Sequence, residues 1–369
     1  MKKRLLFAVD IKDWAYHNIA KSYGDYLSHY DLYYYITKDY AIREKKFNFF
    51  QFLYINTLNA IRFYVFKAFG KQSKVYFVDK TLKFSYPVYI HDKVYSLKTN
   101  EIANPKKVDY LWEMAYYFQY ISVLPKIKFS KKFVGIYTDS FPHEGPSHDI
   151  RKNADVSSLN LQHFYSEYLH HYQGIIVGSK NLLELYSPIA ENIVFSSNIL
   201  GQNLFQENNH VGKNEELCIA WTGNPAREMK NFYTIIEPTI DFLRKKGLCV
   251  RLKTKFSGSY EELYTFYTDV DLIIIASDAD TGPSMFAEAA LSNVPAVSTY
   301  IGFPKMVVQN NVNGVIVENN TIKDFAEAIE TLYHDRELLK KFSNRIKQDY
   351  LAELDNQKMA NDLINFIEA

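Results

Sequence analysis

A turn at residues 222–230 (TGNPAREMK) places two cations shortly after a glycine. Gly223 allows the backbone to turn sharply at the end of an expected strand, and Asn224 follows it. Arg227 and Lys230 are spaced to clamp a pyrophosphate, because guanidinium and ammonium groups both pair with phosphate oxygens. The turn therefore predicts a phosphate site in which Gly223 and Asn224 contact the same ligand.

A second loop combines two carboxylates with an expected helix start. Asp280 precedes Gly282, Pro283 and Ser284, and Glu288 follows Asp280 by eight positions. Backbone N–H groups at a helix N-terminus favour a bound phosphate. Glu288 would lie one turn into that helix, where its carboxylate can accept hydrogen bonds from both hydroxyls of a ribose. This loop predicts nucleotide recognition.

Short apolar segments and helical segments alternate from residue 217 onward, which predicts a parallel, doubly wound sheet covered by helices. Such sheets bind ligands outside the carboxyl ends of their strands, where both loops above would lie. A third glycine turn, residues 299–304 (TYIGFP), follows another expected strand at the same edge. We expect strands near 217–222, 248–253, 270–277, 295–299 and 314–318, and helices near 231–246, 260–267, 284–292 and from 322 to the end.

The first half of the chain has its own strand pattern, with expected strands at 4–9, 32–37, 108–112, 133–137 and 174–177. Residues 75–95 look extended, and residues 44–69 predict a long helix because they contain neither Gly nor Pro. A further helix is expected at 157–172. The polar stretch 203–214 marks the expected domain boundary.

A polar loop follows the expected strand 133–137 and carries Asp139, His143 and His148. With Glu144 and Asp149 these side chains could ligate a metal, but their spacing fits no common zinc pattern. A polar active-site loop is the preferred interpretation. A merely solvated loop is the alternative.

The three loops, in this order, resemble glycosyltransferase family 4, the retaining enzymes of the GT-B fold. The strongest match is DTGPSMFAEAALSNVPAVSTYIGFPKMVVQNNVNGVIV at 280–317, which carries the paired acids, the Ala-rich helix and the later glycine turn. WTGNPAREMKN at 221–231 is similar to the phosphate-binding turn of that family, and GIIVGSKNLLELY at 174–186 to its strand and helix between the domains. The resemblance covers about residues 172–345 and is faint before them.

The resemblance implies two Rossmann-like domains: an acceptor domain at 1–203 and a nucleotide-sugar domain at 204–349, with the helix 350–369 packing back on the first. It implies transfer of a hexosyl or other glycosyl group to a saccharide or lipid-linked acceptor with retention, in surface polysaccharide or glycolipid synthesis. Arg227 and Lys230 would stabilise the leaving phosphates as a divalent ion does elsewhere. We therefore expect no metal, and no cofactor beyond the nucleotide-sugar co-substrate.

Two positions depart from the family pattern. The first of the paired acids, which faces the donor sugar in the family, is Asp280 instead of the usual Glu, so its reach is one methylene shorter. In the first half, Thr138-Asp139-Ser140 stands where the family usually has a His after a strand. Asp139 is the candidate for orienting or deprotonating the acceptor, with His143 and His148 as alternatives.

Charge and composition limit the location and the partners. Residues 1–200 hold 26 Lys/Arg and 18 Asp/Glu (+8), whereas residues 201–369 hold 17 and 24 (−7). The first apolar run is too short for a signal peptide, and no run approaches the ~18 apolar residues of a membrane span. We expect a cytoplasmic protein, with peripheral attachment to the inner face of the membrane as an alternative. Near-zero net charge and the lack of a recognised motif disfavour nucleic acid.

Residues 43–74 combine nine Phe and Tyr residues with seven Lys and Arg residues. The rings could pack into the domain core, which is the preferred interpretation, because rings occur at every helical face of the sequence. Alternatively, this segment could lie on an anionic membrane surface and reach a lipid-linked acceptor.

Two other functions stay open at this point. A sugar-nucleotide epimerase can share the fold and would need no acceptor. A non-catalytic GT-B subunit could bind a nucleotide-sugar or a glycan without turnover. The complete set of Arg227, Lys230 and Glu288 argues against the second alternative.

Overall fold

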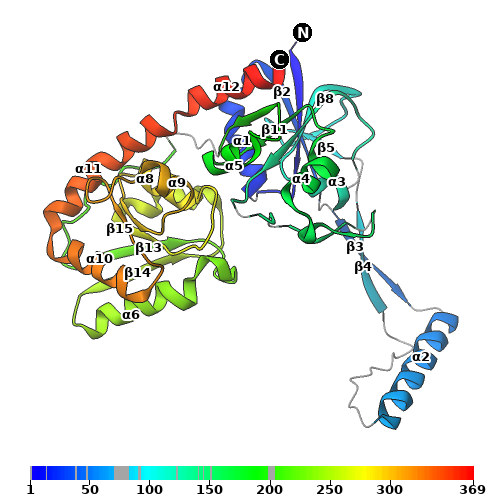
Figure 1. Cartoon of the computed structure of the whole chain (residues 1–369), viewed down its shortest axis with the longest axis horizontal. Helices are drawn as coiled ribbons and strands as arrows, with labels where there is room; N and C mark the ends of the chain where they lie inside the picture. Colours follow the sequence, from blue (N-terminus) through cyan, green and yellow to red (C-terminus); the bar gives the residue numbers. More distant parts are fainter. Residues whose placement is uncertain are drawn as a thin grey trace. The chain divides into compact units, whose positions relative to one another are not determined.

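The computed structural model describes residues 2–369 except Trp14, 38–39, 47–48, 70–82, 90–92, 122–123, Ser140, Glu144, 150–151 and 198–203. The chain divides into two compact units, one formed by Met1–Thr37 with Lys93–Ala369 and the other by Lys38–Asp92 (Figure 1). The expected boundary at 203/204 adjoins residues outside the described ranges. The domain limits 1–203, 204–349 and 350–369 stay predictions.

The first unit begins with an eight-stranded sheet in the order β12-β11-β8-β7-β1-β2-β5-β6. Its strands from β12 to β2 are parallel, and β5 and β6 add an antiparallel edge. The strands are β1 (Lys3–Val9), β2 (Tyr30–Ile36), β5 (Val94–Ser96), β6 (Ile102–Ala103), β7 (Lys107–Glu113), β8 (Lys128–Ile136), β11 (Gly174–Val177) and β12 (Ile193–Phe195). Between them lie α1 (Ala15–Tyr26), α3 (Phe118–Ile121), α4 (Leu161–Phe164), α5 (Lys180–Tyr186) and the small ribbon β9 (His148–Asp149) with β10 (Ala154–Asp155).

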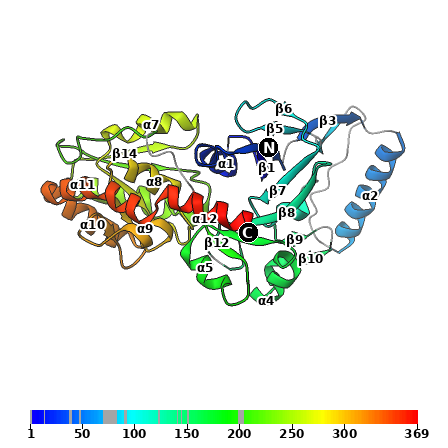
Figure 2. The same cartoon turned by 90° about the horizontal axis from the view of Figure 1, so that it is seen from above.

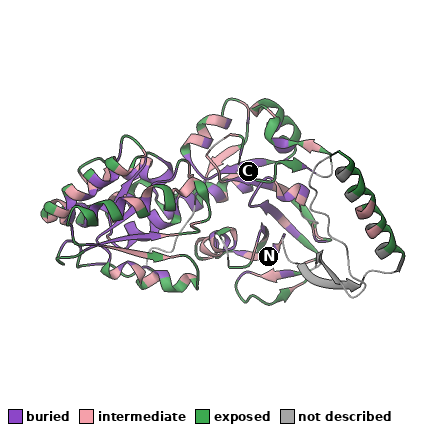
Figure 3. Cartoon of the chain, turned by 90° about the horizontal axis from the view of Figure 1, so that it is seen from below, coloured by how far each residue is buried: buried purple, intermediate pink, exposed green. Residues whose placement is uncertain are grey.

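A five-stranded parallel sheet, in the order β14-β13-β15-β16-β17, follows in the same unit. Its central strands are apolar on both faces, because helices cover both sides (Figure 3). The strands are β13 (Leu217–Thr222), β14 (Val250–Lys255), β15 (Leu272–Ile275), β16 (Ala296–Ser298) and β17 (Val315–Ile316). The helices are α6 (Glu237–Lys245), α7 (Leu263–Phe266), α8 (Ser284–Leu291), α9 (Gly302–Val307), α10 (Ile322–His334), α11 (Arg336–Glu353) and α12 (Asn356–Glu368).

The two parallel sheets confirm the predicted class of two Rossmann-like, doubly wound sheets. The last helix, α12, contacts β12 and α1 of the first sheet (Figure 2). Lys3 Nζ lies 2.9 Å from a carboxylate oxygen of Glu368, and the Tyr30 hydroxyl donates to the same carboxylate. The end of the chain is therefore tied to the first two strands.

Several expected elements change in detail. Residues 44–46 belong to strand β3 (Tyr40–Lys46), and the helix that follows is α2 (Phe49–Ala68). Strand β4 (Lys83–Tyr89) pairs antiparallel with β3, because β-branched and aromatic residues favour a ribbon there. The expected helix 157–172 is reduced to α4 and a π-helical turn. Of the extended segment expected at 75–95, residues 75–82 and 90–92 lie outside the described residues.

Candidate active site

The strand order of the second sheet places two loops side by side. β13 and β15 are neighbours in the sheet but not in sequence, and the strand order reverses at this pair. In doubly wound sheets the loops beyond such a switch point form the ligand crevice. The turn after β13 and the loop between β15 and α8 are the two segments singled out by their chemistry.

Gly223 starts the first of these loops with a φ of +145°. A Cβ at this position would lie 3.1 Å from the ring of Trp221, so a side chain would meet both backbone strain and a crowded neighbour. Asn224 Oδ1 then accepts a hydrogen bond from the backbone N–H of Ala226 at 3.0 Å. The turn continues into a single 3₁₀ turn, Glu228–Lys230, and the ammonium group of Lys230 reaches Asp280 in the neighbouring loop.

Lys230 and Asp280 form an ion pair across the two loops. Both side chains are largely buried, with exposed fractions of 18% and 16%. The structure thus brings together the cation expected on the phosphates and the acid expected near the transferred sugar. Arg227 lies on the exposed side of the same turn.

Glu288 is buried in α8, with 2% of its surface exposed. Tyr267 donates a hydrogen bond to Glu288 Oε2 at 2.8 Å, and Tyr260 donates to Oε1 at 3.3 Å. Burial raises the pKa of Glu288 to about 7, although these two hydrogen bonds act in the opposite direction. The sequence analysis missed both tyrosines, whose only signal was their position just before an apolar strand.

A pocket of about 400 Å³ lies over these loops. Its wall includes seven of the predicted residues: Gly223, Asn224, Arg227, Lys230, Pro283, Ser284 and Glu288. Asp13, which precedes α1, and Asn18 on α1 also line it, from the side of the first sheet. Its volume is in the range typical of small-ligand sites. We refer to it as the C-terminal pocket.

Aromatic rings form another wall of the C-terminal pocket. Trp221, Phe256 and Tyr260 all line it, and the rings of Trp221 and Phe256 lie 5.9 Å apart. The Phe256 side chain is 48% exposed. An accessible ring of this kind can stack on a planar ligand such as a nucleobase.

The glycine turn at 299–304 packs closely against the loop that carries Asp280 and Gly282. Gly302 has a φ of +38°, and a Cβ on it would lie 2.3 Å from the carbonyl oxygen of Asp280. A Cβ on Gly282 would lie 2.5 Å from the ring of Phe303. Only glycine therefore permits this close approach, which fixes the backbone that carries Asp280.

Asp139 follows β8 in the first sheet and is partly buried. The hydroxyl of Ser179 donates to Asp139 Oδ1, and Asn181 Nδ2 donates to Oδ2 at 3.4 Å. Burial raises the pKa of Asp139, and the charge of Asp280 contributes to the rise. Lys305 Nζ donates to Asn181 Oδ1 at 2.8 Å. Its positive charge lowers the pKa of Asp139 and so partly offsets this rise. Ser179, Asn181 and Lys305 were not predicted from the sequence.

The two histidine alternatives have surroundings that differ from those of Asp139. His143 is 7% exposed and packs among aromatic rings, with Nε2 at 2.5 Å from the Tyr186 hydroxyl and Nδ1 at 3.1 Å from the Thr138 carbonyl oxygen. The His143 side chain is therefore part of the packed core beneath the loop. His148 lies exposed in β9. Among the described residues, which exclude Glu144, no group of three or more His, Cys, Asp or Glu side chains could hold a metal ion.

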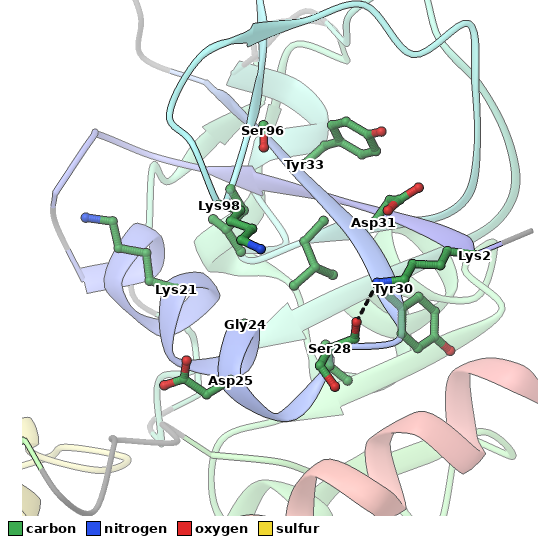
Figure 4. A pocket seen from close by; sticks show the side chains of 13 residues that line it. Lys2, Lys21, Gly24, Asp25, Ser28, Tyr30, Asp31, Tyr33, Ser96 and Lys98 are labelled. Atoms are coloured by element: carbon green, nitrogen blue, oxygen red, sulfur yellow. Dashed lines mark hydrogen bonds between the residues drawn. The ribbon is translucent and has the colours of Figure 1, made fainter.

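A larger pocket of about 560 Å³ lies in the first sheet, between α1, β2 and the turn after β5 (Figure 4). Its lining mixes charges and hydroxyls, including Lys21, Asp25, Asp31, Tyr33 and Lys98. We call it the α1 pocket.

A third pocket of about 370 Å³ connects the other two along α1. It shares Lys21 and Asp25 with the α1 pocket, and Asp13 and Asn18 with the C-terminal pocket. Asn18 and Asp25 are seven residues apart on α1, which corresponds to about 10 Å of helix. The three pockets therefore follow one another along this helix.

The two sheets and the pocket at the switch point define the class: the chain has the GT-B fold of glycosyltransferases. Residues 240–349 match the family described as Glycosyl transferases group 1, so this part of the chain is a group 1 glycosyltransferase domain.

Solved structures with the same fold extend over the whole chain. A mutant of TarM from S. aureus, in complex with fondaparinux, α-GlcNAc-glycerol and UDP, aligns with a TM-score of 0.64 at 13% identity and covers 100% of both chains. HepE from Anabaena in complex with UDP-glucose aligns with a TM-score of 0.57 at 11% identity and covers 99% of both chains.

A curated relative is more similar in sequence. The lipopolysaccharide core biosynthesis glycosyltransferase LpsE of Rhizobium meliloti (strain 1021) is 22% identical over 158 residues, which cover 38% of this chain and 46% of LpsE. The match thus spans less than half of the length of that relative.

Proposed function

We propose that this chain is a glycosyltransferase that moves a sugar from a nucleotide-sugar to a saccharide or lipid-linked acceptor with retention of anomeric configuration. The observation that carries the proposal is the C-terminal pocket, in which Lys230, Ser284 and Glu288 line one cavity beside Asp280. The group 1 domain at 240–349 and the nucleotide-bound GT-B neighbours support the same activity. LpsE supports a role in surface polysaccharide or glycolipid synthesis.

The donor binds with its nucleotide in the C-terminal pocket. Glu288 accepts hydrogen bonds from the ribose hydroxyls, and Phe256 stacks on the base. The N-terminus of α8 and Lys230 receive the phosphates, where positive charge stabilises the leaving group. Arg227 contributes a second cation at the exposed edge, so the reaction needs no metal ion.

Donor binding changes the partner of Lys230. In the free protein Lys230 is neutralised by Asp280. A diphosphate carries more negative charge than one carboxylate, so Lys230 shifts toward the phosphates and Asp280 is left to accept a hydrogen bond from the sugar. The bond from the anomeric carbon to the phosphate oxygen then breaks through an oxocarbenium-like state. The acceptor oxygen attacks on the face that the phosphate leaves.

Asp139 orients the acceptor hydroxyl and takes its proton. Its raised pKa makes it a better base than an ordinary aspartate, and Ser179 with Asn181 fixes its orientation. The acceptor chain extends from this point along α1, where the α1 pocket offers the mixture of charges and hydroxyls that suits a polyhydroxylated ligand.

The decisive test is a binding and turnover screen of the purified protein against UDP-, GDP-, ADP-, CMP- and dTDP-sugars, with EDTA present. We expect one nucleotide class to bind. In Lys230→Ala, turnover should fall about 10²–10³-fold, similar to the loss of one oxyanion donor. Lys323→Ala is the matched control, because Lys323 is 79% exposed and lies on α10. Wild-type turnover in Lys230→Ala, or binding to none of these nucleotides, would remove the donor-site assignment.

Product analysis separates retention from the other functions. NMR of the product should show the anomeric configuration of the donor. An altered nucleotide-sugar formed without acceptor would indicate an epimerase. Nucleotide-sugar binding with no turnover on any acceptor would indicate a non-catalytic subunit.

A further inference from the structure

The second unit, Lys38–Asp92, presents apolar side chains on and just after its helix α2, whose aromatic rings the sequence analysis preferred to place in a core. Among the described side chains eight are well exposed: Phe50 (78%), Leu53 (51%), Tyr54 (67%), Leu58 (43%), Ile61 (55%), Tyr64 (68%), Val65 (48%) and Phe69 (77%). Core packing is therefore wrong for the four rings of this set (Figure 3).

These eight side chains share one face of the helix. Six of them, from Phe50 to Phe69, follow one another at intervals of three or four residues, and Leu53 and Tyr64 each lie beside a member of this row. Such spacing produces a continuous apolar stripe. Thr57 lies on the same stripe, but its hydroxyl donates to the carbonyl oxygen of Leu53 at 2.7 Å and so has a partner within the helix. We call this surface the α2 face.

Charge identifies what covers the α2 face. Residues 38–92 contain ten Lys/Arg and four Asp/Glu, a net charge of +6, and the helix itself contains no acidic residue. A second copy would bring the same positive charge against it, which disfavours self-association. An anionic lipid surface is complementary both to the charge and to the apolar stripe.

The length and composition of helix α2 fit attachment to a membrane surface and not a membrane span. No helix within the described residues is long and apolar enough to cross a membrane. A helix of the length of α2 can lie in the plane of the headgroups with its exposed apolar side chains inserted.

We propose that the α2 face docks on an anionic lipid bilayer. The α2 face inserts among the acyl chains, and the net positive charge of the unit attracts the anionic headgroups. This attachment depends on the second unit alone and not on the donor site.

The test measures flotation of the full chain with phosphatidylcholine vesicles that contain or lack phosphatidylglycerol. We expect binding to the anionic vesicles, with weaker binding as salt is raised. Leu53→Gln/Ile61→Gln should lower the partition coefficient at least about tenfold, because two buried aliphatic side chains are lost from the interface.

Asn56→Gln/Asn59→Gln is the matched control, since it introduces the same residues in the same helix, changes no charge and leaves the α2 face intact. It should bind within about threefold of the wild type, a difference of under 1 kcal/mol. Circular dichroism and nucleotide-sugar binding are measured on all variants, so that loss of folding and failure of the donor site are both recognised.

Three outcomes would overturn the proposal. The first is that the wild type does not float with the anionic vesicles. Both variant pairs could lose binding equally. Finally, the protein could form a concentration-dependent dimer without lipid that Leu53→Gln/Ile61→Gln abolishes, which would make a second copy the partner. None of these outcomes affects nucleotide-sugar binding, so the proposed transferase activity is judged separately.

Discussion

Asp139 follows a strand of the first sheet, and its carboxylate is affected by the charge of Asp280, which follows a strand of the second sheet. It accepts hydrogen bonds from Ser179 and Asn181, and Asp280 is near enough for its charge to raise the pKa of Asp139. A partly buried carboxylate held in this way is suited to taking a proton, and its role can be separated from donor binding.

Replacing Asp139 by Asn should lower kcat about 10²–10⁴-fold and leave the donor dissociation constant unchanged, because the amide keeps the shape but cannot accept the proton. Steady-state kinetics and donor titration measure the two quantities. Because the pKa of Asp139 is raised, kcat of the wild type should begin to fall, as the pH is lowered, at a pH above the usual pKa of an aspartate. A variant that keeps the wild-type kcat would exclude Asp139 as the base.

Glu288 should make both stability and donor binding depend on pH. Its pKa is about 7 in the fold and near 4.5 in the unfolded chain. Between these values the folded state holds a proton that the unfolded state lacks, so Glu288 lowers the stability as the pH rises from about 4.5 to 7. Glu288→Gln should flatten this part of the pH–stability profile. It should be more stable than the wild type at pH 8, by on the order of 1–3 kcal/mol.

Chemical denaturation at several pH values measures this effect, and calorimetric titration of the donor measures binding. In the proposed donor site the ionised carboxylate accepts hydrogen bonds from the ribose hydroxyls, so we expect the donor affinity of the wild type to increase as the pH rises through 7. The same pH–stability slope in Glu288→Gln and wild type would contradict the assignment.

At the scale of elements, the site depends on loops that touch through glycines. The loop after β15 and the turn before α9 meet at Gly302, whose α-carbon faces the backbone of Asp280 and Thr281. Gly302→Ala would place a methyl group 2.3 Å from the Asp280 carbonyl oxygen, so the loop must move.

Gly302→Ala should therefore lose about 1–3 kcal/mol of stability and lower kcat, because it displaces Asp280 as well as straining its own backbone. Gly247→Ala is a suitable comparison: its φ is +87°, but nothing lies within 4 Å of the added Cβ. Thermal melts and kinetics should show strain in both variants and a loss of kcat only in Gly302→Ala. Equal kcat values in the two variants would indicate that Gly302 does not position Asp280.

At the scale of the whole molecule, the last helix returns to the first sheet. In α12, Met359, Leu363 and Ile367 are buried, and the ring of Phe366 lies 5.7 Å from that of Phe133 on β8. The chain end therefore contributes to the core of the sheet that its first residues build.

Ending the chain after Glu353 should cost several kcal/mol, at about 1.5–3 kcal/mol for each buried side chain removed. Removing only Glu368 and Ala369 deletes the contacts of Glu368 with Lys3 and Tyr30 and should cost much less, because this ion pair is exposed to solvent. Denaturant melts of the two truncations compare them. Similar stability in both would mean that α12 is not part of the first domain.

Local signals in the sequence were sufficient to predict the two sheets and most residues of the C-terminal pocket. The regular apolar strands and the three glycine turns predicted the parallel sheets and the loops at their carboxyl edge, because backbone geometry and burial act on neighbouring residues. Gly223, Arg227, Lys230, Ser284 and Glu288 were all predicted for one site, and the structure places all of them around the C-terminal pocket.

Contacts between distant segments were decided only by the tertiary structure. The pairing of Lys230 with Asp280, the tyrosines on Glu288 and the network of Asp139 with Asn181 and Lys305 depend on which strands are neighbours, and strand order has no local signature. The burial of His143 and the exposure of the α2 face also depend on what packs against each segment. Residue types fix the chemistry that a chain can perform, whereas long-range packing fixes which of these residues meet.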